Sequence, residues 1–199
     1  LLALSLSAPA VTIAQDEASP ATRQKHAELA LRLSQAADDS DFENAERGKI
    51  AEIPDGLILG KNGQVVWDRR PYDFLKNPTA PNTVNPSLWR QARLNAVHGL
   101  FEVVPNKIWQ VRGYDIAVMT IIAGKSGWII IDPLVTEEAA AASWKLFTDT
   151  IEPTLGKRPI RAMLFSHSHT DHFGGVGGIL TAEQVKREKI RVIAPHGFS

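Results

Sequence analysis

Short, mainly apolar runs fill the middle of the chain. Apolar runs of this length bounded by turn residues are typical of strands. Turn-forming residues separate the runs, so we expect neighbouring runs to pair as a meander. The four expected strands are residues 100–104, 108–112, 116–122 and 128–131. Residues 160–165 are predicted to be a buried strand, and residues 190–194 a further strand.

Helical patterns flank these strands. Residues 136–150 give the clearest one, because Thr136 can cap a helix whose positive end suits Glu137 and Glu138. Weaker patterns predict a polar, partly helical lead-in and two further helices, at residues 18–47, 87–97 and 174–189.

The segment before the meander contains strong turn signals. Asn62-Gly63 lies between two β-rich runs and predicts a hairpin, since both residues tolerate positive φ. Residues 69–86 hold four prolines, and no regular element is expected there. Asn85, followed by Pro86, should cap the helix at 87–97. Hairpins followed by a strand–helix–strand alternation indicate a mixed α/β layered domain.

Composition and charge narrow the function classes. Hydrophobic residues make up 44% of the 199 residues and charged residues 22%, as in an ordinary globular chain. Lys plus Arg and Asp plus Glu both total 22, so net charge gives no reason to expect a nucleic-acid partner. The chain has no cysteine, which excludes disulfides, thiolate metal sites and a cysteine nucleophile. Any metal must therefore be bound by nitrogen and oxygen.

The first 14 residues are small and apolar, and Gln15 then begins a polar stretch. This pattern resembles the end of a secretory signal, so we expect a signal-peptide remnant at 1–15 and a secreted or periplasmic protein. An Ala-rich flexible end is the alternative. The run is too short to span a bilayer, and no stable membrane span is expected.

The candidate chemistry follows the strand predicted at 160–165. His167, His169, Asp171 and His172 fall within six residues and include three of the six histidines of the chain. If the strand continued, His167 and His169 would share one face, while the adjacent Asp171 and His172 would diverge toward a second ion. Gly174 and Gly175 would then turn the backbone beneath the ions. Zn²⁺ is the default ion for such an N/O site, and a metal-free, His-rich loop is the alternative.

This His-x-His-x-Asp-His motif with the following Gly-Gly resembles the signature of the metallo-β-lactamase superfamily. Upstream blocks favour its SdsA-type zinc-dependent alkylsulfatases, and the resemblance covers roughly residues 40–195. The blocks are Asn85-Pro-Ser-Leu-Trp-Arg-Gln, His98-Gly-Leu-Phe-Glu-Val, Ile108-Trp-Gln-Val-Arg-Gly-Tyr-Asp and Gly127-Trp-Ile-Ile-Ile-Asp-Pro. The chain departs from the family in Ile116-Ala117-Val118-Met119, which lacks the Ser-Asn pair expected after Tyr-Asp.

The resemblance implies the N-terminal half of an αββα sandwich. The expected divisions are a signal remnant at 1–15, an N-terminal extension at 16–99 and the first part of the catalytic domain at 100–199. It also implies two zinc ions, one held by His167 and His169 and the other by Asp171 and His172, with Asp132 as a partner to a ligand histidine. The remaining family ligands are not identifiable before Ser199, so we expect an N-terminal fragment. The complete enzyme is expected to be a homodimer.

The implied activity is hydrolysis of an alkyl sulfate to an alcohol and inorganic sulfate. Two divalent ions can lower the pKa of a bridging water, and Asp171, the expected catalytic residue, would orient it. Other readings remain open at this point. The chain could belong to another hydrolase of the same fold, acting on a lactam, thioester or phosphodiester, or be a non-catalytic metal-binding fragment. Tyr114 and Arg112 could line the approach to the metals or be ordinary strand residues.

Overall fold

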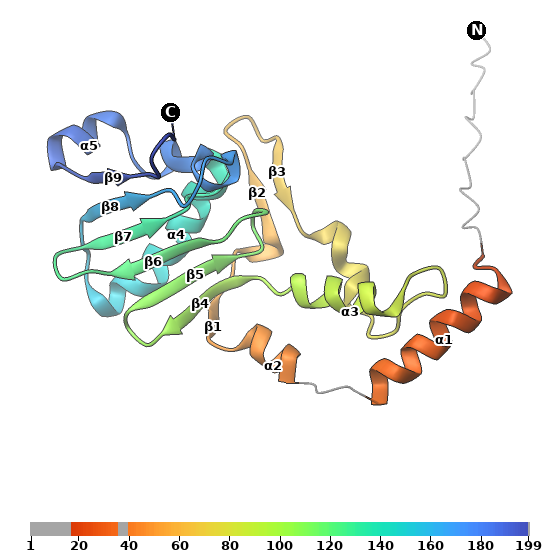
Figure 1. Ribbon diagram of the computed structural model, residues 1–199. Helices are drawn as coiled ribbons and strands as arrows, with labels where there is room; N and C mark the ends of the chain where they lie inside the picture. The colour runs from red at the N-terminus through yellow and green to blue at the C-terminus, as the bar shows by residue number, and fades with distance from the viewer. Residues whose placement is uncertain (1–16, 36–39, 199) are drawn as a thin grey trace, which may run out of the picture. The chain divides into compact units, whose positions relative to one another are not determined.

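The computed structural model describes residues 17–35 and 40–198 (Figure 1). These residues form two compact units, one of 17–35 with 79–90, the other of 40–78 with 91–198. The signal remnant expected at 1–15 lies outside the described residues, and the division expected at residue 99 stays a prediction. Among the described helices, none has the length and apolar content needed to cross a bilayer.

Side-chain caps are present at α1 (Pro20–Gln35) and α3 (Pro86–Asn95). The Ser19 hydroxyl accepts a hydrogen bond from Thr22 N at 3.1 Å. Asn85 Oδ1 accepts from Ser87 N at 2.9 Å, which confirms the predicted cap before Pro86. A side-chain acceptor at each start satisfies amides that have no partner within the helix.

A mixed sheet dominates the larger unit (Figure 1). In the part of the chain that the structure describes it has seven strands, in the order β1-β4-β5-β6-β7-β8-β9. Neighbours from β1 to β7 are antiparallel, whereas β7–β8 and β8–β9 are parallel. The strands are β1 (Lys49–Ala51), β4 (Gly99–Val104), β5 (Ile108–Arg112), β6 (Met119–Ala123), β7 (Trp128–Ile131), β8 (Ile160–Leu164) and β9 (Arg191–Ile193).

A separate hairpin and several short helices complete this unit. Strands β2 (Leu57–Leu59) and β3 (Val65–Asp68) pair antiparallel around Asn62-Gly63, as predicted. Only Gly63 of that pair has a positive φ, of 78°. The short helices are α2 (Ser40–Glu46), η1 (Pro54–Gly56), η2 (Arg70–Lys76), η3 (Thr170–His172), η4 (Gly174–Gly178) and α5 (Ala182–Glu188).

The core lies between the sheet and α4 (Glu137–Leu155), which covers one face of it (Figure 1). The predicted cap is present, because Thr136 Oγ1 accepts from Ala139 N at 3.1 Å. Phe147 of α4 contacts Trp109 and Trp128 at ring-centroid distances of 5.5 and 5.0 Å, and all three are fully buried. Edge-to-face contacts suit the quadrupoles of these rings and fix how the helix lies on the strands.

Three sequence predictions are wrong in detail. Strand β6 begins at Met119 rather than residue 116, because the Asp115 carboxylate binds Ala117 N and Val135 N and takes that segment out of the ladder. The helix predicted at 174–189 is divided into η4 and α5, and Thr181 with Gln184 forms a capping box that starts α5 anew. Residues 69–86 contain the 3-10 helix η2, although no element was expected there.

Replacing Ser143 with Ala should stabilise the protein. Ser143 lies on the buried face of α4, and its hydroxyl has no hydrogen-bond partner among the described residues. A buried unsatisfied hydroxyl is destabilising, so Ser143→Ala should raise the free energy of unfolding by about 1 kcal/mol in a urea titration. The control is Ala141→Ser at an exposed position of α4, which should cost about 0.5 kcal/mol through helix propensity alone. A gain at Ser143 no larger than the loss at Ala141 would contradict the role of the buried hydroxyl.

Candidate functional site

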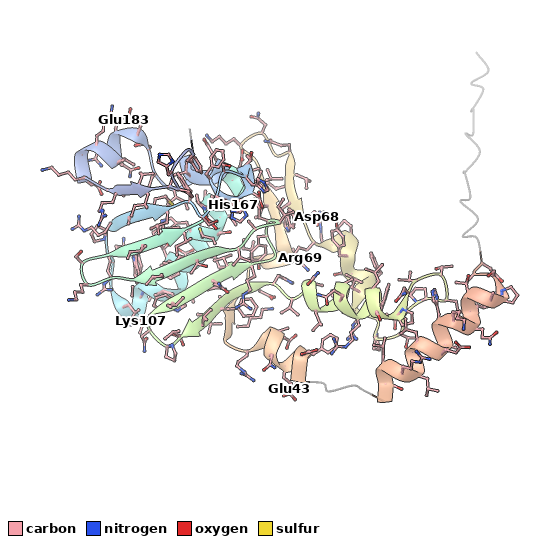
Figure 2. All side chains as sticks on the ribbon, viewed as in Figure 1. Glu43, Asp68, Arg69, Lys107, His167 and Glu183 are labelled. Atoms are coloured by element: carbon pink, nitrogen blue, oxygen red, sulfur yellow. The ribbon has the colours of Figure 1, made fainter. Side chains whose placement is uncertain are left out.

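The His-rich segment forms a loop at the end of β8, among the ends of the central strands (Figure 2). Strand β8 stops at Leu164, one residue before the predicted end, so His167 and His169 do not share the face of a continued strand. The reason is a tertiary contact: Ser166 N donates to the Asp132 carboxylate at 2.7 Å instead of to a neighbouring strand. His167 and His169 are exposed, whereas Asp171 and His172 are half-buried.

The loop nevertheless brings the predicted residues together. The ring centroids of His167 and His169 are 4.7 Å apart, and those of His167 and His172 are 3.9 Å apart. Asp171 Oδ2 lies 3.1 Å from His172 Nε2. Asp171 and His172 therefore face each other and do not diverge as expected from their adjacency.

Asp132 organises this cluster from the end of β7. It is 8% exposed, and its backbone has a positive φ of 56°. Its carboxylate accepts hydrogen bonds from Ser166 N, from Ser166 Oγ at 2.6 Å and from His172 Nδ1 at 2.8 Å. Asp132 therefore contacts a predicted ligand histidine, as the resemblance implied.

These hydrogen bonds determine which imidazole nitrogens are left free. The Ser166 hydroxyl has one proton, which Asp132 Oδ2 receives, so Ser166 Oγ must accept from His167 Nδ1 at 3.0 Å. His172 Nδ1 likewise carries a proton, because it faces the carboxylate. In their neutral tautomers both rings then present an Nε2 lone pair, which is the form that binds a metal.

Ser166, His172 and Asp132 do not form a nucleophilic triad. A triad needs one imidazole nitrogen on the carboxylate and the other on the hydroxyl. Here Nδ1 of His172 faces both Asp132 Oδ2 and Ser166 Oγ, at 2.8 and 3.3 Å, and the hydroxyl proton goes directly to the carboxylate. Ser166 therefore supports the loop. Sequence reasoning assigned it no role, although a hydroxyl next to a strand-end histidine was a usable signal.

The electrostatics of Asp132 follow from the same contacts. Burial raises the pKa of Asp132, but the hydrogen bonds from Ser166 and His172 outweigh burial, and the net pKa lies below its ordinary value. The group is thus a carboxylate at neutral pH and can hold the Nδ1 proton of His172.

Gly174 and Gly175 lie so close to the loop that follows β7 that a side chain would not fit there. A Cβ on Gly174 would lie 2.3 Å from Val135 O, and one on Gly175 would lie 2.2 Å from Pro133 O. Gly175 N donates to Leu134 O at 2.8 Å. Neither glycine has a positive φ, so the sharp-turn role predicted for them is replaced by a packing role.

Tyr114 and Arg112 have structural roles. Tyr114 is 1% exposed, its hydroxyl accepts from Ile53 N at 2.7 Å, and burial raises its pKa to about 12. The Arg112 guanidinium lies over the Phe101 ring, 4.4 Å from its centroid. Tyr114 is therefore too buried to line a path by which a substrate would reach the His cluster.

The donor set suits a divalent cation but is incomplete. Nitrogen and oxygen donors are what Zn²⁺ accepts in the absence of thiolates. A lone pair on His172 Nε2 and the Asp171 carboxylate repel each other at 3.1 Å unless a proton or cation lies close to both. Within residues 17–35 and 40–198, however, no three His, Asp or Glu side chains converge as a group that could hold a metal ion. The described residues thus bring four potential donors close together without forming a complete metal-holding group.

Comparison with known proteins relates this site to a family. Residues 112–199 match the profile of the Metallo-beta-lactamase superfamily. The alkyl/aryl-sulfatase BDS1 of Saccharomyces cerevisiae is 47% identical over 92% of the chain and 27% of its own length. An (R)-specific secondary-alkylsulfatase of Pseudomonas sp. is also 47% identical, over the whole chain and 29% of its own length. Residues 112–199 therefore resemble the metallo-beta-lactamase superfamily, and the chain is similar to alkylsulfatases along most of its length.

A solved structure supports the same relationship. The stereoselective inverting sec-alkylsulfatase Pisa1 from Pseudomonas sp. matches with a TM-score of 0.81 and 50% identity, over 92% of this chain and 28% of that one. The predicted mixed α/β fold of this superfamily and the predicted resemblance to alkylsulfatases are confirmed. The chain spans less than a third of the length of these relatives.

Replacing Asp132 with Asn should lower stability in a pH-dependent way. At pH 7 the loss should be about 1–3 kcal/mol, because hydrogen bonds to a charged acceptor are removed. Since the folded-state pKa lies below the ordinary 3.8, the carboxylate stabilises the fold above that pH, and this contribution is lost as the pH falls through the folded-state pKa. Urea titrations from pH 7 to pH 3 should therefore show the two proteins converging in acid. The control is Asp149→Asn, at an exposed position of α4. If the difference in unfolding free energy between the wild type and Asp132→Asn did not change with pH, the stabilising role of the Asp132 carboxylate would be contradicted.

Proposed function

We propose that this chain supplies the first metal ligands of an alkylsulfatase, an enzyme that hydrolyses an alkyl sulfate to an alcohol and inorganic sulfate. The observation that carries the proposal is the cluster of His167, His169, Asp171 and His172, oriented through Asp132, in a chain 47% identical to alkylsulfatases. The resemblance further implies two zinc ions and a homodimer, and the small, apolar N-terminal stretch favours export; we include all three in the proposal.

Each residue of the cluster has a distinct part. His167 and His169 would hold one ion, and Asp171 and His172 the other, through the nitrogen and oxygen donors they direct into the loop. When bound, such ions make water nucleophilic near neutral pH and offset the charge that develops on sulfate. Asp171 is half-buried beside His172, where its carboxylate can orient that water by accepting a hydrogen bond.

Asp132 and Ser166 act on the histidines and not on substrate. Asp132 holds the Nδ1 proton of His172, and Ser166 receives that of His167, so both rings keep the Nε2 face toward the loop. Such outer partners fix ring orientation, and their loss typically lowers metal affinity or activity by about 10–100-fold.

Replacing Asp171 with Ala should abolish sulfatase activity in the full-length product of the gene that carries this sequence. Sulfate release from a long-chain alkyl sulfate should fall by about 100-fold or more, because a ligand contributes at least as much as its outer partners. Asp149→Ala, on the exposed surface of α4, should leave the rate unchanged. If the full-length product cleaves a lactam or phosphodiester but no alkyl sulfate, the proposed substrate class is wrong.

The 199-residue chain alone should bind metal weakly and release little sulfate. The physical reason is that the described residues form no complete metal-holding group. Isothermal titration with Zn²⁺ should show weak binding that His169→Ala reduces further, and sulfate release should stay at background. Multi-turnover hydrolysis by the isolated chain would contradict the idea that further ligands are required.

A further inference from the structure

The loop that follows β7 holds an unusual backbone beside the His cluster. Asp132 and Leu134 both lie in the left-handed region, with φ of 56° and 67°, although neither is glycine. Such conformations cost free energy and persist only where the surroundings hold them in place. Because Asp132 carries the acceptor of His172, whatever holds this loop also sets where that acceptor lies.

Asp115 is one of the groups that hold the loop. Its Oδ2 accepts a hydrogen bond from Val135 N at 3.0 Å, and its Oδ1 accepts from Ala117 N at 3.2 Å. On the other side of the loop, Gly175 N donates to Leu134 O at 2.8 Å. The strained segment is therefore bonded both to the Asp115 carboxylate and to the backbone of Gly175, which belongs to the site loop.

Asp115 is itself fixed by segments that precede residue 112. The Gly113 carbonyl accepts from Trp67 Nε1 at 3.0 Å and from Arg69 Nη1 at 2.9 Å. Tyr114, between Gly113 and Asp115, is buried and bound to Ile53 N. The carboxylate thus projects from a backbone turn that is anchored on both preceding residues.

We propose that Asp115 is a positioning residue for the site: through Val135 N it holds the loop so that Asp132 meets His172. The proposal rests on the role proposed for His172 as a metal ligand. A purely local role, in which Asp115 only closes its own turn through Ala117 N, is the competing explanation. The two differ in whether a change at Asp115 reaches His172.

The test is Asp115→Asn, read by nuclear magnetic resonance in the metal-free 199-residue chain. Asn keeps one acceptor oxygen but replaces the other with an amide, so it cannot serve both N–H groups. We expect at least 10-fold faster hydrogen exchange at Val135 N and at His172 Nδ1, with the sheet amides unchanged. Co²⁺ titration, followed by its visible absorption, should show at least 10-fold weaker binding.

The matched control is Glu102→Gln, which also alters a carboxylate that accepts a backbone N–H, here Asn106 N at 2.8 Å in the β4–β5 turn. Because Gln keeps an acceptor oxygen for this single N–H, exchange at Asn106 N, Val135 N and His172 Nδ1 should stay close to the wild-type rates. If Asp115→Asn speeds exchange at Val135 N but leaves exchange at His172 Nδ1 at the wild-type rate, the proposal is overturned and only the local role is left.

If Asp115→Asn does not fold, the unaltered chain supplies a second test. Native-state exchange across a series of low urea concentrations should show Val135 N and His172 Nδ1 opening in one event, with the same free energy and urea dependence. Separate opening of the two groups would overturn the proposal. Neither measurement depends on sulfatase activity, so failure of the proposed function can be told apart from failure of this inference.

Discussion

The candidate site depends on one buried carboxylate. Asp132 stands at the end of β7 and accepts hydrogen bonds from the backbone and hydroxyl of Ser166 and from the imidazole of His172. These bonds end β8, begin the site loop and choose the tautomer of a predicted metal ligand. The cost of burying the charge is offset because each of these donors points at it, which is also why its pKa stays low.

Contacts elsewhere in the larger unit hold the Asp132 carboxylate in position. The contact of Phe147 with Trp109 and Trp128 sets α4 against the sheet, and α4 follows directly from the loop that carries Asp132. Gly174 and Gly175 let the site loop approach that same loop closely. The residues that precede the profile match at 112 also take part, because Trp67 and Arg69 hold the Gly113 carbonyl.

The incomplete set of possible metal ligands also has a physical cause. Three imidazoles and a carboxylate in contact are donors that suit a cation, yet the described residues do not form a group that could hold one. A full coordination sphere needs donors from several directions, and one loop of six residues presents its donors from one side. Relatives more than three times as long offer chain from which further donors can come.

Much of this protein follows from its sequence. Apolar runs between turn residues predicted β5 and β7 to the residue, Asn62-Gly63 predicted a hairpin, and Thr136 and Asn85 predicted caps, because these signals act between residues close along the chain. The His and Asp spacing likewise indicated a cation site. Only the tertiary structure decided where β6 begins, where β8 ends and how the imidazoles are oriented. Those features depend on Asp115 reaching Val135 and on Asp132 reaching Ser166 and His172, contacts across 20 to 40 residues that no local pattern records.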